Sequence, residues 1–372
     1  MLAMPLLIIV KSFMRRLTMS KLAKKMLSFA AFAVMVTACS MKHTKEVKNE
    51  PMAAPSQGVQ NSAPTIYEPE KGSHHPYTSL SRVTFSESGK DFDPNISLDG
   101  EYLYFASTMH ALKPDIYRKK IFSKVVERIT FDDAVDINPA ISPNGKVLAF
   151  ASNRNGKFQI WVKAVDTNSR TPQQLSRGDY EDRNPSWSPD NKKLVFNRRN
   201  ETAGVWEVWE YNMITNEETA LRVFGLYPKY SPDGKKIICQ THRNRDMPWF
   251  SIWTYTFEDE KIEEILENAQ WGAVTPSFSN DGKFICFGAI AKSYGLKEDT
   301  KYNQGDDIWL IGSDGNNLIR LTNHEAPDWH PVWGTENRIF FISLRNGYQN
   351  IWMIKPKLPD DSLMQLTNEV NK

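Results

Sequence analysis

The fold is decided by the stretch Pro228-Lys-Tyr-Ser231-Pro-Asp-Gly234-Lys-Lys-Ile-Ile-Cys239. A Pro-x-apolar-Ser marker leads into a Ser-Pro-Asp-Gly turn, which is followed by a largely apolar run. Proline presets φ at the second position of the turn, aspartate closes the turn locally, and glycine accepts the positive φ that follows. The stretch therefore predicts a β-hairpin whose second strand is covered on both faces.

The same marker occurs six times, and its last positions are 45, 46, 43, 48 and 55 residues apart. In each unit the hairpin is followed by an apolar-aromatic pair such as Ile252-Trp253, and a more polar run such as Arg320-Leu-Thr322 closes several units. The six copies of the marker are Pro94–Ser97, Pro139–Ser142, Pro185–Ser188, Pro228–Ser231, Pro276–Ser279 and Pro331–Gly334. Repeats of this length are typical of propeller blades.

Four antiparallel strands per unit, with the middle strands apolar on both sides, predict an all-β fold: a six-bladed β-propeller of four-stranded antiparallel blades. A solenoid would also explain a repeat, but it usually needs polar end caps. This array instead begins with Leu80-Ser-Arg-Val-Thr84, which is itself a copy of the fourth strand, and it ends with another copy at Gln365-Leu-Thr367. Seven outer strands for six blades indicate that one terminal copy closes the ring, and the sequence leaves open which one.

The unit Pro-x-aromatic-Ser-Pro-Asp-Gly-Lys-Lys, followed by a β-branched strand, Ile-Trp and Arg-Leu-Thr, resembles the repeat of the TolB propeller family. The resemblance covers about residues 80 to 370. It implies a fold more strongly than a function, because propellers of this type also occur in peptidases, lyases and binding proteins. TolB carries an α/β domain before its propeller, whereas this chain has only a tether at that place, so the resemblance does not extend to that domain's role.

The first 38 residues have the build of a secretory signal, with Lys21, Lys24 and Lys25 before an apolar stretch and small residues before Cys39. This arrangement resembles a lipobox, which implies that Cys39 is lipidated; an uncleaved membrane anchor is the alternative. Met19 is a second candidate for the start of translation. Residues 39–78 are rich in proline and polar residues and predict a disordered, flexible tether, so that the propeller occupies residues 79–372. We expect an outer-membrane lipoprotein with its propeller in the periplasm of a bacterium.

The charge of the chain argues against nucleic acid as a partner. The formal net charge is +2, but all six cations of residues 1–38 belong to the signal, and residues 39–372 hold 40 Lys and Arg against 44 Asp and Glu. A slightly acidic body without a basic run lacks the electrostatic footprint of a nucleic-acid-binding protein. Besides Cys39 the chain contains Cys239 and Cys286, which stand in adjacent columns of neighbouring repeats and are expected to point to opposite faces of their sheets, without a disulfide.

Aromatic residues outside the repeated columns mark a candidate partner-binding face. The loops between the second and third strands, and the links between blades, share one end of a propeller. Four tryptophans and the two tyrosines of the longest insertion fall in or beside those segments, and such residues on irregular loops suit protein recognition. They are Trp206, Trp249, Trp271, Trp329, Tyr294 and Tyr302. We expect an envelope protein as the partner, and the TolB resemblance implies a peptidoglycan-associated lipoprotein or a Tol component; local packing of each side chain is the alternative.

Four blades begin with Asp-x-x-Pro, and the acids are Asp91, Asp136, Asp182 and Asp328. If these carboxylates converged at the channel mouth they would suit a cation such as Ca²⁺. The alternative is that each accepts backbone N–H bonds where its strand begins.

Four histidines, His110, His242, His324 and His330, also fall in loops at the same end. Their convergence would support a metal-assisted polysaccharide lyase or a hydrolase at the channel mouth, although their spacing matches no zinc signature. The sequence contains no Gly-x-Ser-x-Gly elbow, P-loop or dinucleotide fingerprint. We therefore assign no catalytic or cofactor-binding residue, and favour a non-enzymatic, lipid-anchored interaction module over the enzyme.

Overall fold

A computed structural model describes residues 66–67, 76–165, 171–244, 247–266, 271–291 and 306–359, without the side chains of residues 66–67, 242–249 and 291. The chain divides into two units, Met1–Gln60 and Asn61–Lys372, and all described residues belong to the second. The signal segment, Cys39, Tyr294 and Tyr302 lie outside the described residues, and the side chains of His242 and Trp249 are not described.

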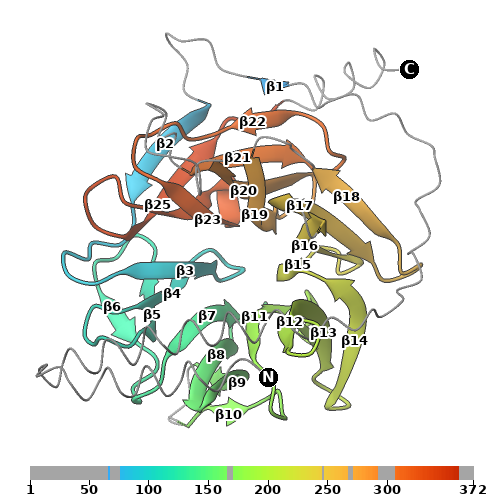
Figure 1. The fold of residues 1–372 in the computed structure, drawn as a ribbon. Coiled ribbons are helices and arrows are strands. Elements are labelled where there is room, and N and C mark those ends of the chain that lie inside the picture. Colours follow the sequence, from blue (N-terminus) through green and yellow to red (C-terminus); the bar gives the residue numbers. More distant parts are fainter. Residues whose placement is uncertain are drawn as a thin grey trace, which may run out of the picture. The chain divides into compact units, whose positions relative to one another are not determined.

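The second unit is a six-bladed β-propeller, as the repeat predicts, with antiparallel blades around a common centre (Figure 1). Blade 1 consists of β3 (Asp91–Ile96), β4 (Tyr102–Ser107), β5 (Asp115–Lys120) and β6 (Val126–Arg128). Blade 2 consists of β7 (Asp136–Ile141), β8 (Val147–Asn155), β9 (Lys157–Ala164) and β10 (Gln173–Gln174). Blade 3 consists of β11 (Asp182–Trp187), β12 (Lys193–Asn200), β13 (Val205–Asn212) and β14 (Glu217–Phe224).

Blades 4 to 6 repeat this order from the innermost strand outward. Blade 4 consists of β15 (Leu226–Tyr230), β16 (Lys236–Asn244), β17 (Met247–Thr256) and β18 (Ile262–Leu266). Blade 5 consists of β19 (Trp271–Phe278), β20 (Phe284–Ala291), β21 (Asp307–Gly312) and β22 (Leu318–Arg320), and β1 (Ile66–Tyr67) pairs in parallel with its outer edge. Blade 6 contains β23 (Asp328–Trp333), the short helix η1 (Thr335–Asn337), β24 (Ile339–Ser343) and β25 (Asn350–Pro356).

The N-terminal copy of the outer strand closes the ring. The strand β2 (Tyr77–Arg82) pairs antiparallel with β25 and is the fourth strand of blade 6. Just beyond β2, the amides of Val83 and Thr84 donate to the carbonyl of Ile351, at 2.8 and 3.2 Å. The described part of the chain thus answers the question that the sequence left open, because the first blade-like strand completes the last blade.

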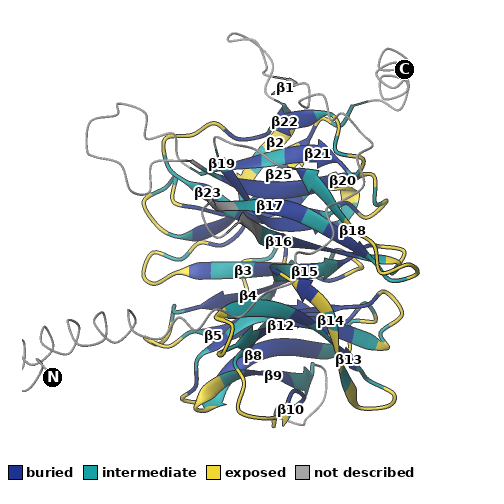
Figure 2. Ribbon diagram, turned by 45° about the vertical axis from the view of Figure 1, so that its right-hand side comes forward, coloured by how far each residue is buried: buried dark blue, intermediate teal, exposed yellow. Residues whose placement is uncertain are grey.

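Six buried apolar clusters hold the ring together, one at each junction between neighbouring blades. The cluster between blades 6 and 1 packs Phe340 and Met353 against Leu103 and Phe105, so the array is closed and is not an open stack. Figure 2 shows the buried residues along the middle strands and the exposed ones at the loops. Both faces of each middle strand are covered, which explains why these strands are apolar throughout rather than alternating.

The repeated turn forms as its residues dictate. In the turn of blade 4, the Gly234 amide donates to the Ser231 carbonyl at 2.9 Å, and the Ser231 hydroxyl donates to Asp233 at 2.6 Å. Gly234 has φ +72°, a conformation that favours glycine. Each turn thereby fixes the register of its hairpin.

The two cysteines of the propeller are free and buried. Cys239 packs in the cluster between blades 3 and 4, and Cys286 in the cluster between blades 5 and 6. Burial raises the pKa of the Cys239 thiol to about 12, so it is unreactive at neutral pH. No helix within the described residues is long and apolar enough to cross a membrane.

Candidate functional site

The alternating strand directions sort the connections of the propeller onto two faces. We call the end where the first and third strands begin the loop face; it carries the segments 83–90, 108–114, 129–135, 175–181, 321–327 and 344–349. We call the opposite end the turn face; it carries the tight turns 97–101, 142–146, 188–192, 231–235 and 279–283. A ligand bound at one end therefore meets a different set of side chains from a ligand bound at the other.

The four tryptophans of the candidate partner-binding face each lie within the first three residues of a first or third strand, and hence at the loop face: Trp206 in β13, Trp249 in β17, Trp271 in β19 and Trp329 in β23. Trp271 is half-buried, and its ring stacks on Trp309 at 5.3 Å and on Phe287 at 5.8 Å between centroids. Trp206 is also half-buried, with the Arg199 guanidinium 5.6 Å from its ring. Part of this aromatic surface is thus used in local packing.

More exposed aromatic side chains lie in the loops and at a strand end of the loop face, and sequence reasoning missed them. Five described aromatic residues of the loop face are between 44% and 62% exposed. They are Phe85, Phe131, Tyr180, Phe224 and Tyr348. The sequence does contain a pattern that could have identified two of them. Phe85 and Phe131 follow equivalent threonines at the ends of outer-strand copies, Arg82-Val-Thr-Phe85 and Arg128-Ile-Thr-Phe131.

Cations lie over three of these exposed rings. The distance from the guanidinium carbon to the ring centroid is 4.4 Å for Arg82 over Phe85 and 5.4 Å for Arg128 over Phe131. Arg198 lies 4.6 Å from the Tyr180 centroid. Such stacking limits the freedom of each ring, so that binding a partner here costs less side-chain entropy.

The aspartates at the beginnings of the innermost strands are all buried and bonded within their own blades. Two of them show the pattern. The Asp182 carboxylate takes a bidentate pair of bonds from Arg198, each 2.8 Å long. Asp91 instead accepts from the hydroxyls of Ser107 at 2.6 Å and Ser86 at 2.8 Å.

The other two aspartates face arginines. Arg154 donates to both oxygens of Asp136, at 3.2 and 3.1 Å, and Arg345 is ion-paired with Asp328. Burial raises the pKa of both carboxyls, and this effect is opposed by Ser152 and Arg154 for Asp136 and by Ser343 and Arg345 for Asp328. Within the described ranges, no group of three or more His, Cys, Asp or Glu side chains is arranged to hold a metal ion. The cation site stays a prediction.

A second ring of residues comes from the position before each marker proline. All six have a left-handed backbone, with φ between 50° and 54°, and each stands at a shift of the strand register. They are Asp93, Asn138, Asn184, Tyr227, Thr275 and His330. Left-handed φ is rare and strained for residues other than glycine and asparagine, so the strand pairing on both sides must impose it.

Four members of this ring meet at the axis of the propeller. Asp93 Oδ1 lies 3.2 Å from His330 Nδ1, and Asp93 Oδ2 accepts from the amide and the side chain of Asn138 at 3.0 and 2.8 Å. The His330 ring contacts Tyr227 edge-on at 5.3 Å between centroids. Since blade 5 stands between blades 4 and 6, the contact between Tyr227 and His330 lies on the inner side of the ring. We call Asp93, Asn138, Tyr227 and His330 the axial cluster.

The remaining described histidines do not join this cluster through any contact found among the described residues. His110 Nδ1 lies 3.0 Å from the hydroxyl of Tyr117 in its own blade, and His324 Nδ1 accepts from the Ala326 amide at 2.9 Å. Among the described residues, His330 is therefore the histidine whose side chain lies at the axis, with Nδ1 beside the Asp93 carboxylate.

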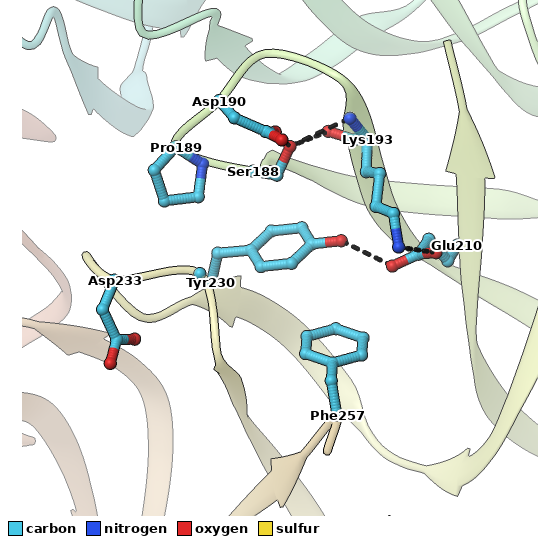
Figure 3. Close-up of a pocket in the computed structure, with 9 residues that line it drawn as sticks. Ser188, Pro189, Asp190, Lys193, Glu210, Tyr230, Asp233 and Phe257 are labelled. Carbon is cyan, nitrogen blue, oxygen red and sulfur yellow. Dashed lines mark hydrogen bonds and ion pairs between the residues drawn. The ribbon is translucent and has the colours of Figure 1, made fainter. Parts of the chain in front are cut away.

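A separate pocket of about 290 Å³ lies at the turn face between blades 3 and 4 (Figure 3). Its polar groups satisfy one another, because the Tyr230 hydroxyl donates to Glu210 at 2.8 Å and Lys193 pairs with the other oxygen of Glu210 at 2.9 Å. Tyr230 also stacks on Phe257. Burial, reinforced by the Glu210 carboxylate, raises the pKa of Tyr230. These contacts join two blades and pair the Lys193 ammonium with the Glu210 carboxylate.

The fold and its closure define this protein as a six-bladed β-propeller with an outer strand supplied from the N-terminal side. More specifically, the propeller is similar to that of TolB: residues 75–218 match the family model described as the TolB beta propeller domain. The Tol-Pal system protein TolB of Anaeromyxobacter dehalogenans is 30% identical over 135 residues, which are 35% of this chain and 27% of that protein. The chain spans 27% to 32% of the length of the curated relatives that it matches here.

Two solved structures show the same fold at low identity. A TolB-like protein from Agrobacterium tumefaciens has a TM-score of 0.55 at 20% identity, covering 75% of this chain and 97% of that one. An oligogalacturonate lyase from Vibrio parahaemolyticus has a TM-score of 0.52 at 12% identity, covering 76% of this chain and 94% of that one. At these identities the likeness concerns the fold alone, and function must be argued from the site.

Proposed function

We propose that this protein is a non-enzymatic interaction module of the bacterial envelope, which is anchored through lipid at Cys39 and binds another envelope protein with the loop face of its propeller. The observation that carries the proposal is the set of exposed aromatic side chains at the loop face of the rigid propeller, with cations stacked on three of them. Aromatic side chains held on a rigid scaffold are the usual anchors of protein interfaces. The similarity to TolB supports the periplasm as the compartment, and a peptidoglycan-associated lipoprotein or a Tol component as the partner.

Binding to purified candidate partners tests the proposal. The full chain is titrated with the peptidoglycan-associated lipoprotein and with the Tol components of the same bacterium, in wild-type form and as a Phe85→Ser/Phe131→Ser variant. We expect the double substitution to weaken binding by about tenfold or more, because each truncated anchor residue costs about 1 to 4 kcal/mol.

The matched control removes exposed apolar side chains from the opposite end. Leu98 and Phe122 are exposed on the turn side of blade 1, and a Leu98→Ser/Phe122→Ser variant is expected to bind as the wild type does. If both double variants lose affinity equally, or if none of the candidate partners binds, the proposed role of the loop face is wrong.

The lipid anchor has its own test. Cys39→Ser is expected to abolish the incorporation of labelled fatty acid into the protein expressed in its own bacterium, since the thiol is the acylated group. Continued labelling of the Cys39→Ser variant would show that the anchor has been misplaced.

A second candidate function, a metal-assisted lyase or hydrolase, is favoured by one observation: an acid, a histidine and a tyrosine meet at the axis on strained backbone. Strained and titratable residues concentrate at active sites. Measuring the cleavage of acidic polysaccharides with added Mn²⁺ or Ca²⁺, in wild type and in His330→Gln, distinguishes the two functions. Metal-dependent cleavage by the wild type that His330→Gln lacks would support the enzyme.

A further inference from the structure

A cavity of about 340 Å³ opens along the axis at the turn face, and residues of all six blades line it. The position after each marker proline supplies one ring of its wall. These six residues are Asn95, Ala140, Ser186, Lys229, Ser277 and Val332. Of the described residues that line the cavity, Lys229 is the one that carries a charge, and none is Asp or Glu.

Three polar residues of this ring make the same hydrogen bond to the next blade, and Lys229 does not. In three blades the side-chain oxygen accepts a bond from a backbone amide of the next blade along the ring. Asn95 accepts from Ile141 at 3.0 Å, Ser186 from Tyr230 at 3.4 Å and Ser277 from Trp333 at 3.2 Å. An ammonium group has no lone pair and cannot accept such a bond, so Lys229 does not serve this inter-blade contact.

Lys229 also forms no ion pair with any of the described residues. The acid whose charge acts on it is Asp93 of the axial cluster, but both oxygens of Asp93 are engaged by His330 and Asn138. Burial lowers the pKa of Lys229 to about 8, which means that its surroundings disfavour the charged form. An enclosed cation without a partner is costly and gains most from a bound anion.

The rest of the lining indicates the kind of anion. Asn95, Ser186 and Ser277 use their oxygens as acceptors in the inter-blade bonds, so the amide hydrogens of Asn95 and the hydroxyl hydrogens of the serines remain to be donated. Around them the wall is apolar, with Trp187, Phe278 and Trp333 among its members. Ligand sites are mostly apolar cavities with a few polar groups that fix the orientation of the ligand.

We propose that this axial cavity binds a small organic carboxylate, whose charged group pairs with Lys229 and whose apolar body lies against the aromatic wall. The site is independent of the proposed loop-face function, because it lies at the opposite end of the ring and uses none of the exposed aromatic residues of that face.

The test uses 2-naphthoate as the probe and its neutral analogue 2-naphthamide, each titrated into the full chain at pH 7 by calorimetry. We expect the wild type to bind the carboxylate about tenfold or more tightly than the amide, because a hydrogen bond to a charged group is stronger than one to a neutral group. Lys229→Met, which keeps the length and apolar stem of the side chain, is expected to lose this preference. Lys235→Met is the control: it removes an exposed cation from the turn of the same blade and should leave binding unchanged.

The pH dependence of binding tests the role of Lys229 even if Lys229→Met is unstable. Between pH 7 and 9.5 the wild type is expected to lose affinity about tenfold per unit above pH 8, as Lys229 is deprotonated, whereas Lys229→Arg keeps its affinity because a guanidinium stays charged. Of the other titratable groups at the axis and in the wall, Asp93 and His330 form their own pair, and burial raises the pKa of Tyr230 and, to about 12, that of Tyr227.

Three outcomes would overturn the proposal. They are no binding of 2-naphthoate to the wild type at millimolar concentration, equal affinities for the carboxylate and the amide, and the same pH dependence in the wild type and in Lys229→Arg.

Discussion

At the residue scale, charged side chains of the propeller fall into two kinds: those that form buried ion pairs within a blade, and one, Lys229, that could bind a ligand. Asp182 and Arg198 are both almost inaccessible to solvent, and their bidentate pairing compensates two buried charges at the start of blade 3. Lys229 is half-buried in the wall of a cavity and has no such partner among the described residues. The Asp182–Arg198 pair stabilises the first strand of blade 3, whereas the unpaired Lys229 would be stabilised by a bound anion.

We predict that Arg198→Met destabilises the propeller by about 3–5 kcal/mol, because it leaves the Asp182 carboxylate buried without its partner. The free energy of unfolding in urea measures the effect. Arg199→Met, at the neighbouring half-buried position over Trp206, is the control and should cost about 0.5 kcal/mol or less. A cost below about 1 kcal/mol for Arg198→Met would show that the ion pair does not secure the strand.

Asp307 gives a prediction for the pH dependence of stability. Burial raises the pKa of its carboxyl from 3.8 to about 6, against the opposing effect of Arg320. Between these values the folded protein binds a proton that the unfolded chain has released, so the contribution of Asp307 to stability falls as the pH rises from about 4 to 6. Compared with Asp307→Asn, the wild type should lose on the order of 2 kcal/mol of unfolding free energy between pH 4.5 and 7.

The exposed Asp314→Asn variant is the control for that measurement and should follow the wild-type curve. If Asp307→Asn and the wild type change in parallel over this pH range, the buried carboxyl is not protonated as stated.

At the scale of the element, the strand β2 decides whether the ring is closed. It covers the edge of β25, and Val83, just after it, is buried between blades 6 and 1. An uncovered strand edge invites pairing with another chain. We predict that a chain beginning at Asn61 keeps the wild-type melting temperature, whereas a chain beginning at Phe85, which lacks β2, unfolds at lower temperature and self-associates. Size-exclusion chromatography and thermal unfolding measure both effects, and identical behaviour of the two chains would contradict the closure.

The sequence predicted the blades because the information for a blade is local. A marker, a turn and two apolar strands lie within about 20 residues, and turn chemistry such as that of Ser231 to Gly234 fixes the register. It did not predict which terminal strand closes the ring, because both copies share one pattern and the pairing of Leu80 with Ile354 joins residues far apart in the chain. A choice between two equivalent strands requires the tertiary structure.

The candidate site was predictable only in part, because it too depends on contacts between residues far apart in the chain. Residue types indicated an aromatic loop face, but not which rings are exposed: Trp271 stacks on Trp309, whereas Phe85 and Phe131 stand in solvent. The axial cluster was missed because Asp93 and His330 come from opposite ends of the repeat array, and closure of the ring is what makes their blades neighbours. The Asp-x-x-Pro aspartates were visible in the sequence, but the arginine partners of three of them and the serine partners of Asp91 were not.

At the scale of the whole molecule, closure makes the blades depend on one another. Each of the six clusters needs residues from two blades, so that a fault in one junction weakens the entire ring. We predict that Phe196→Ala, between blades 2 and 3, and Phe341→Ala, between blades 5 and 6, each cost about 3–5 kcal/mol and lower the melting temperature of one shared transition. Calorimetry measures it, and two separate transitions in either variant would contradict a single cooperative ring.

A rigid ring with different chemistry at its two ends suits a protein that receives a macromolecule on one face and a small anion on the other. The central claim is that the loop face is the surface that recognises a partner protein. The most direct test is hydrogen–deuterium exchange of the full chain with and without a bound envelope partner. Protection of residues 83–90, 129–135 and 175–181 is the predicted result, and protection confined to the turns 97–101, 142–146 and 231–235 would contradict the claim.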